Sequence, residues 1–227
     1  ISTDDNEGST AYDKKFKTIY FTRCVDDGGS NLACDIYYAP VVGNQFGASQ
    51  PLFLVNREED DTTQIGHPAI TQDGLFMIFA SDLAGGFGGK DLWFSKFDKT
   101  SDSWGAPQNL GADINTPYDE MFPTLRKDGS LYFSSNGHGG LGGFEICSAQ
   151  VREGEMAFAE VSLLPYPLNS ASDELGLVFK GMTYSGFFSS NRPGGKGQDD
   201  LYSFRLPPME FCYKAYVYDY DTGMPVG

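Results

Sequence analysis

A repeat of about 55 residues constrains the fold of this 227-residue chain more than any other feature. Residues 73–93, 128–147 and 184–202 read DGLFMIFASDLAGGFGGKDLW, DGSLYFSSNGHGGLGGFEIC and YSGFFSSNRPGGKGQDDLY, and residues 18–37 form a diverged copy. Two landmarks recur in all four copies, an acid (Asp35, Asp91, Glu145 and Asp200) and an aromatic (Phe21, Phe79, Phe133 and Phe188). Self-similarity at a fixed period of this size indicates stacked structural repeats.

Each copy contains short runs of strand-forming residues separated by turns. In the third copy the runs are Met121–Arg126, Leu131–Ser135, Phe144–Ala149 and Phe158–Leu164. Asp128 and Gly129 form a tight-turn dipeptide, and a Gly-rich segment joins the second and third runs. Four antiparallel strands per repeat, without helical periodicity, predict an all-β fold, a β-propeller with four blades of about 55 residues.

The repeats also predict how the chain is divided. Blades are expected at about residues 1–55, 56–113, 114–170 and 171–206. The fourth copy stops after three strands, because Pro207 and Pro208 cannot donate to a sheet ladder. We therefore expect a mature or excised segment whose parent ring has six blades. Residues 207–227 are expected to form a linker and the first strand of another β domain.

The copies follow the pattern DE…P…DG…LYFSSN(R)PGG.GG.DIY…WG.P.NLG..INT, which resembles the TolB-like, WD-type propeller repeats of Gram-negative envelope proteins. The tail DTGMPVG resembles the start of a carboxypeptidase-regulatory-like β-sandwich, and this order is similar to the middle of OmpA-family proteins. The resemblance implies a non-catalytic interaction module in the periplasm that supports type IX secretion, in a parent protein associated with the outer membrane. Its partners would be other envelope or secretion-system proteins, and only a domain outside this segment would bind peptidoglycan.

The charge and hydropathy of the chain exclude two classes of partner. The net charge of −15 repels phosphate backbones, so nucleic-acid binding is not expected. No stretch approaches 18 apolar residues, so no membrane-spanning helix is expected in this segment.

Two of the four cysteines are placed to form a disulfide. Cys24 and Cys34 flank the polar loop VDDGGSNLA between two strand-like runs, a geometry that suits a bridge across the base of a hairpin. Such a bridge would imply an oxidising compartment, the periplasm or the exterior. The alternative is a pair of reduced cysteines in a loop. Cys147 and Cys212 have no evident partner in the sequence.

The Gly-rich loops at residues 85–89, 139–143 and 194–197 admit three interpretations. Phosphate binding is rejected, because these loops lead into strands rather than helices. A lone calcium ion, held by Asp82 and Asp91 or by Asp199 and Asp200, stays open as an alternative. The favoured interpretation is structural: glycine permits left-handed backbone, and the acids Asp35, Asp91, Glu145 and Asp200 bond to loop amides. No metal or cofactor is expected.

Catalysis has little support in the sequence. His67 and His138 are the only histidines, and no nucleophile elbow or zinc-protease motif is present. The carboxylate pairs Asp119/Glu120 and Asp173/Glu174 recur at the start of first strands, so blade architecture explains them better than glycoside hydrolysis does. We predict that the chain is not an enzyme. The alternatives are the regulatory propeller of a hydrolase and a sugar- or peptide-binding propeller.

One face of the predicted ring is the candidate partner-binding surface. In a blade whose first strand lines the channel, the Gly-rich loops share a face with the segments that enter the first strands. Loops on a rigid scaffold are where binding usually resides, so Phe87, His138 and Arg192, at the loop tips, are the predicted partner-binding residues. The alternatives are ordinary exposed tips and, for Arg192, an ion pair with a neighbouring acid.

Overall fold

The described part of the chain is built of β-strands. In this computed structural model it comprises residues 1–13, 15–26, 32–56, 62–152, 156–206, 218 and 220–224. These residues form seventeen strands in four antiparallel sheets. Among them, no helix has the length and apolar character that crossing a membrane requires. Pro207, Pro208, Cys212 and most of the expected linker and sandwich strand lie outside the described residues.

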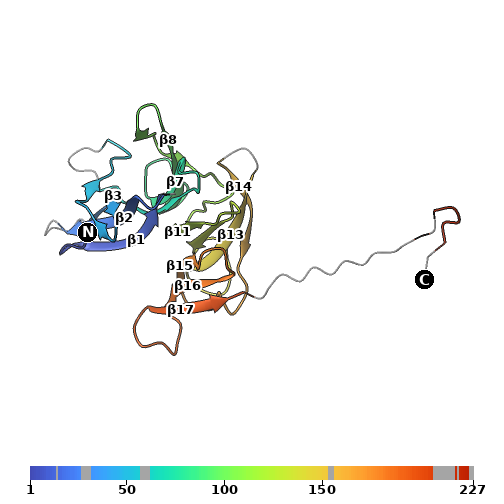
Figure 1. The fold of residues 1–227 in the computed structure, drawn as a ribbon. Helices are drawn as coiled ribbons and strands as arrows, with labels where there is room; N and C mark the ends of the chain where they lie inside the picture. The colour runs from blue at the N-terminus through green and yellow to red at the C-terminus, as the bar shows by residue number, and fades with distance from the viewer. Residues whose placement is uncertain are drawn as a thin grey trace.

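Each repeat folds into one sheet, which confirms the predicted all-β propeller arrangement of four blades (Figure 1). Blade one contains β1 (Asn6–Tyr12), β2 (Thr18–Asp26), β3 (Leu32–Val42), β4 (Gln45–Phe46) and β5 (Gln50–Pro51). Blade two contains β6 (Ile65–Ile70), β7 (Phe76–Ser81), β8 (Asp91–Asp98), β9 (Ser103–Trp104) and β10 (Gln108–Asn109). Blade three contains β11 (Glu120–Leu125), β12 (Leu131–Ser135), β13 (Glu145–Val151) and β14 (Phe158–Leu163). Blade four contains β15 (Glu174–Phe179), β16 (Ser185–Ser190) and β17 (Asp200–Arg205).

Within every blade the first three strands pair in chain order. The first strands β1, β6, β11 and β15 lie side by side in that order and form the inner wall. The loops between second and third strands, residues 82–90, 136–144 and 191–199, form one surface of the propeller, which we call the Gly-loop face. The hairpins between first and second strands form the opposite face.

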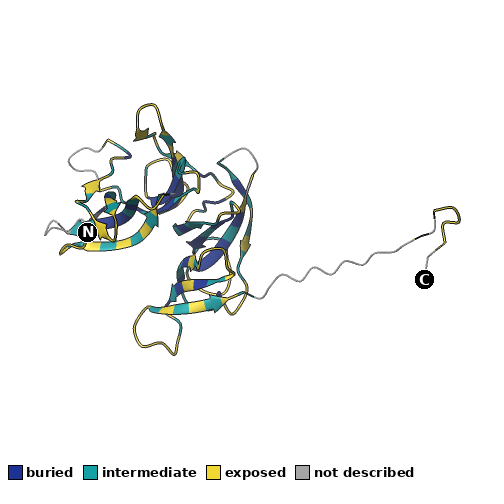
Figure 2. Cartoon of the chain, viewed as in Figure 1, coloured by how far each residue is buried: buried dark blue, intermediate teal, exposed yellow. Residues whose placement is uncertain are grey.

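The hydrophobic core lies between neighbouring blades rather than within one sheet. The landmark aromatics Phe79, Phe133 and Phe188 are buried, each against residues of the preceding blade. Phe79, for example, packs with Ile36 and Leu54 of blade one. Figure 2 shows this burial concentrated along the middle strands of the blades, whereas the outward-lying β1 is exposed or half-buried. The repeat anchors found in the sequence therefore occupy equivalent positions, because each blade must bury one face against the next.

The predicted disulfide is present in blade one. Cys24 and Cys34 lie opposite each other in the β2–β3 ladder and are covalently joined. In the chain-entropy model, closing the loop between Cys24 and Cys34 lowers the entropy of the unfolded chain and so stabilises the fold by about 2.5–3 kcal/mol. Cys147 is a free thiol buried inside blade three.

Candidate functional site

A contact between neighbouring blades recurs on the Gly-loop face. The N–H of Lys90, just before β8, donates to Asp119 Oδ1 (2.8 Å), and its C=O accepts from the N–H of Glu120 (2.6 Å). One repeat later the same two bonds, of 2.8 and 2.7 Å, join Phe144 to Asp173 and Glu174. The acid pair at the start of each of these first strands therefore docks its blade onto the loop of the preceding blade.

The glycines of these loops meet two different requirements. Gly85, Gly139 and Gly194 have φ of +92°, +79° and +99°, the left-handed backbone that the sequence predicts. Gly88 and Gly142 are instead crowded by the next blade. A Cβ on Gly88 would lie 2.0 Å from the carbonyl oxygen of Tyr118, and one on Gly142 would lie 2.6 Å from the backbone of the next connector. This second requirement could not be predicted from the sequence, because close approach between blades leaves no local signal.

The loop acids fix the backbone of their own loops. Asp91 accepts hydrogen bonds from the N–H groups of Phe87 (2.5 Å) and Gly88 (3.1 Å). The equivalent bonds are made by Glu145, to Leu141 and Gly142, and by Asp200, to Lys196 and Gly197. In blade one Asp35 lies opposite Arg23 in the β2–β3 ladder, and residues 27–31 of the loop before it are outside the described residues.

Two of the three predicted partner-binding residues turn inward. His138 Nε2 lies 2.8 Å from the carbonyl oxygen of Ile114, and Arg192 Nη2 donates to the carbonyl oxygen of Leu168 (2.7 Å). Ile114 and Leu168 occupy the same repeat position, in the connector that enters the first strand. In blade one Arg23, which has the ladder position of Ser135 and Ser190, donates from Nη2 to the carbonyl oxygen of Ile1 (2.8 Å). These contacts give His138 and Arg192 a structural role at the junction between blades.

The inner acid of each docking pair is buried and fully engaged. Glu174 accepts from Ser170 N–H (2.9 Å), Ser170 Oγ (2.6 Å), Ser190 Oγ (3.0 Å) and Arg192 Nη2 (2.9 Å). Glu120 is held in the same way by Thr116 and Ser135. The predicted pairing of Arg192 with a neighbouring acid is therefore present, and the two carboxylates hold the entrances of β11 and β15.

Apolar side chains nevertheless stand exposed on the Gly-loop face. Phe87 and Leu141 are 50% and 62% exposed, and both occupy the fourth position before a loop acid. Tyr118, whose backbone contacts Gly88, is 60% exposed. Of these three side chains, only Phe87 is predicted from the sequence to bind a partner. Leu141 has the same repeat position as Phe87, so the repeat could have indicated it too. The exposure of Tyr118 is evident only from the structure.

The inner wall carries a register shift in the first strand of every blade. The residues at these bulges have left-handed φ: Ser9, His67, Phe122 and Gly176. The same four residues line a cavity of about 120 Å³ in the centre of the arc. The His67 ring stacks on Phe122 at a centroid distance of 3.9 Å, and its Nδ1 accepts from the Phe122 N–H (3.4 Å).

The protonation of His67 should make stability depend on pH. Burial lowers its pKa from 6.5 to about 4, and the charge of Lys90 adds to this effect. Because the folded-state pKa lies below the unfolded-state value, stability is complete above about pH 6.5 and is lost as the pH falls towards 4. Between pH 7 and pH 5 we expect the parent chain to lose about 2 kcal/mol more than a His67→Gln variant, measured by urea unfolding. Equal losses in the two chains would rule out His67 as the source.

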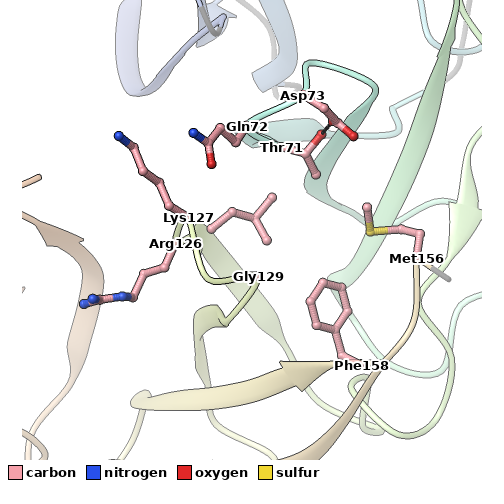
Figure 3. Close-up of a pocket in the computed structure, with 9 residues that line it drawn as sticks. Thr71, Gln72, Asp73, Arg126, Lys127, Gly129, Met156 and Phe158 are labelled. Carbon is pink, nitrogen blue, oxygen red and sulfur yellow. Dashed lines mark hydrogen bonds between the residues drawn. The ribbon is translucent and has the colours of Figure 1, made fainter. Parts of the chain in front are cut away.

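The opposite face holds a cavity of about 340 Å³ between the hairpins of blades two and three (Figure 3). Met156 and Phe158 line one side, and Gln72 and Lys127 lie across from them. Arg126 points away from the cavity and stacks its guanidinium on the Phe179 ring at 4.2 Å. The cavity thus combines apolar walls with polar groups at its edge.

The described residues include a buried free thiol but no cluster of metal-binding side chains. Among the described residues, no three His, Cys, Asp or Glu side chains gather where they could hold a metal ion. Burial, with the charges of Glu120 and Glu145, raises the pKa of the Cys147 thiol to about 12. A thiol in this state is a poor nucleophile.

Comparison with known proteins shows the fold. No protein-family model matches the sequence, and no curated protein matches it. TolB from Acinetobacter baumannii is similar at a TM-score of 0.56 and 15% identity, over 99% of this chain and 44% of that chain. A luciferin-regenerating enzyme is similar at a TM-score of 0.54 and 12% identity, over 90% of this chain and 62% of that chain. This chain thus spans less than two thirds of either structure, and at these identities the likeness shows a TolB-like β-propeller fold alone.

Proposed function

We propose that this chain is a non-catalytic protein–protein interaction and scaffold propeller whose partner binds the Gly-loop face. The observation that carries the proposal is the set of exposed apolar side chains of Phe87, Tyr118 and Leu141 on that face. They stand on loops whose backbones are fixed by the loop acids and by the docking bonds between blades. Aromatic residues on a pre-organised surface favour protein interfaces, because little entropy is lost on binding.

We place this propeller in the periplasm, within a multidomain OmpA-family envelope protein of the kind represented by PorE of the type IX secretion system. The disulfide between Cys24 and Cys34 supports an oxidising compartment. The resemblance of the repeats to envelope propellers supports the family. The propeller would occupy residues 1–206, and a carboxypeptidase-regulatory-like sandwich would begin within 207–227. Its partners would be other envelope or secretion-system proteins, with peptidoglycan bound by a domain outside this segment.

The proposal that the chain is not an enzyme rests on what its polar groups do. The carboxylates of Glu120 and Glu174 are fully buried and saturated with hydrogen bonds. The two histidines also contact other groups of the fold: His138 lies against the carbonyl oxygen of the connector residue Ile114, and His67 stacks on Phe122. A general acid or base must be free to bond a substrate, and these groups are already engaged by other groups of the fold.

Binding of a short peptide or sugar is a second candidate function. The cavity on the opposite face supports it, because about 340 Å³ is within the range of ligand pockets. Its lining pairs apolar Met156 and Phe158 with hydrogen-bonding Gln72 and Lys127. Titration calorimetry with peptidoglycan fragments and with peptides tests this candidate.

A Phe87→Ala/Leu141→Ala double variant tests the main proposal. We expect recovery of the partner from solubilised envelope extract, quantified by mass spectrometry, to fall about tenfold or more, as for loss of central interface side chains. The matched control is Met182→Ala, which truncates an exposed apolar side chain in the hairpin turn of blade four on the opposite face. Unchanged recovery with the double variant, or an equal loss with the control, would contradict binding through the Gly-loop face.

A further inference from the structure

An arginine fills the space between the hairpins of blades three and four. Arg126 begins the hairpin turn of blade three, and its guanidinium extends onto blade four. The guanidinium carbon lies 4.2 Å from the ring centroid of Phe179 and 5.0 Å from that of Tyr184. Its Nη1 donates to the carbonyl oxygen of Thr183 (3.5 Å). One long side chain thus covers the apolar end of β15 and joins the two hairpins.

A threonine occupies the equivalent position in blade two. The carbonyl oxygens of Thr71 and Arg126 accept from the N–H groups three residues further on, those of Gly74 (2.8 Å) and Gly129 (3.0 Å). Thr71 and Arg126 therefore begin the same turn. The short Thr71 side chain stays within its own hairpin, where its hydroxyl donates to Asp73 Oδ1 (2.6 Å). The space that an arginine fills at the next junction is here left as the cavity of about 340 Å³.

The cavity has an apolar wall, which consists of Leu125, Met156 and Phe158. Leu125 ends β11 as Phe179 ends β15, but Leu125 lines the cavity whereas Phe179 lies under a guanidinium. Leu125 and Met156 pack against the core between blades two and three, to which Phe158 belongs. The apolar wall is therefore pre-formed, and the cavity is large enough for an apolar side chain or a short acyl chain.

The charged group without a partner at the rim of the cavity is a cation. Lys127 and Gln72 lie across from the apolar wall (Figure 3), and within the described part of the chain neither side chain takes part in a hydrogen bond or an ion pair. The carboxylate of Asp73 differs, because its Oδ1 already accepts from the Thr71 hydroxyl and from the Leu75 N–H (2.9 Å). A negatively charged group of a ligand is therefore favoured at the rim, since the Lys127 ammonium can donate a charge-assisted hydrogen bond to it.

We propose that this cavity binds an amphiphilic carboxylate, whose charged group contacts the Lys127 ammonium and whose apolar group fills the space beside the apolar wall. The inference rests on the second candidate function and deepens it by naming the class of ligand. A peptide that ends in a large apolar residue with a free C-terminus has this chemistry, and so does a fatty acid of medium chain length. A neutral sugar does not.

Titration calorimetry with three probes tests the class of ligand. The probes are the peptide N-acetyl-Ala-Ala-Phe with a free C-terminus, the same peptide with a C-terminal amide, and octanoate. We expect the peptide carboxylate to bind at least about tenfold more tightly than the amide, the difference that one charge-assisted hydrogen bond makes. Whichever of the peptide carboxylate and octanoate binds more tightly identifies the source of the carboxylate.

The two peptides also separate this inference from the function on which it rests. Equal affinity for the two peptides, or tighter binding of the amide, would overturn the carboxylate proposal and leave the second candidate function standing. If none of the three probes, no other peptide and no peptidoglycan fragment bound, both would be overturned. Neither result bears on recovery of a partner through the Gly-loop face.

Two variants and a matched control locate the ligand. Lys127→Met should abolish the preference for the carboxylate and change the affinity for the amide by less than about twofold. The control Lys180→Met removes the same charge from the hairpin of blade four, on the same face but outside the cavity lining, and should retain the preference. Thr71→Met places a long uncharged side chain in the cavity and should weaken the binding of both peptides about tenfold or more. A preference that survives Lys127→Met, or binding that survives Thr71→Met, would place the ligand elsewhere and overturn the proposal.

Discussion

A Gly88→Ala variant is expected to melt about 10 °C below the parent chain, a loss of about 3 kcal/mol. The added Cβ would lie 2.0 Å from the carbonyl oxygen of Tyr118 and 2.5 Å from that of Thr116. Both are backbone atoms of the connector between blades two and three. That connector cannot move aside freely, because the N–H and Oγ1 of Thr116 are bonded to the buried Glu120 at 2.9 and 2.7 Å. Differential scanning calorimetry measures the effect directly.

Gly197→Ala is the matched control for this prediction. Gly197 has the same repeat position as Gly88, and neither residue has left-handed φ, so both changes alter the unfolded chain alike. A Cβ at Gly197 would meet its nearest atom at 3.5 Å, which is an ordinary contact. We expect the stability of this variant to stay within about 0.5 kcal/mol of the parent. If the two variants lost the same stability, the cause would be backbone preference rather than the junction between blades.

The strands of the third blade show how far sequence reasoning reaches in this fold. The predicted runs Met121–Arg126 and Leu131–Ser135 correspond to β11 (Glu120–Leu125) and β12 (Leu131–Ser135). The agreement is close because four copies of one pattern report the same strand, and features that persist through divergence mark its core positions. Repetition thus gives several independent indications of each strand, whereas a single copy of the pattern gives only one.

The bonds that His138 and Arg192 make to the connectors could not be predicted from the sequence, for a physical reason. Their acceptors are the backbone carbonyls of Ile114 and Leu168. Every residue has a backbone carbonyl, so the sequence does not indicate which of them accepts a side-chain hydrogen bond. Loop-tip position suggested exposure, whereas burying these polar side chains is compensated by bonds to the connectors. Phe87 differs, because an apolar tip has no such bond to make and stays 50% exposed. The candidate binding residues are therefore the apolar loop tips rather than the polar ones.

An Arg192→Ala variant is expected to lose about 3 kcal/mol of stability, because it leaves the buried carboxylate of Glu174 without its counter-ion. The Arg192 guanidinium lies 2.9 Å from Glu174 Oε1, and the Glu174 side chain has no exposed surface. The same guanidinium donates to the carbonyl oxygens of Pro167 (2.9 Å) and Leu168 (2.7 Å), so its loss also frees the connector. Urea unfolding monitored by fluorescence measures the loss. Arg192→Lys should recover only part of it, since an ammonium cannot reproduce the planar fork.

Arg152→Ala is the control that separates burial from charge. Arg152 and Asp113 form an ion pair of 2.7 Å, shorter than the Arg192 pair, but their side chains are 53% and 59% exposed. Water replaces a lost partner at such a site, so we expect a change below about 1 kcal/mol. If Arg192→Ala were as mild as this control and yet abolished recovery of the partner, Arg192 would belong to the binding surface. A large loss of stability would instead show that the arginine joins blade four to blade three, because only a buried carboxylate makes removal of its counter-ion so costly.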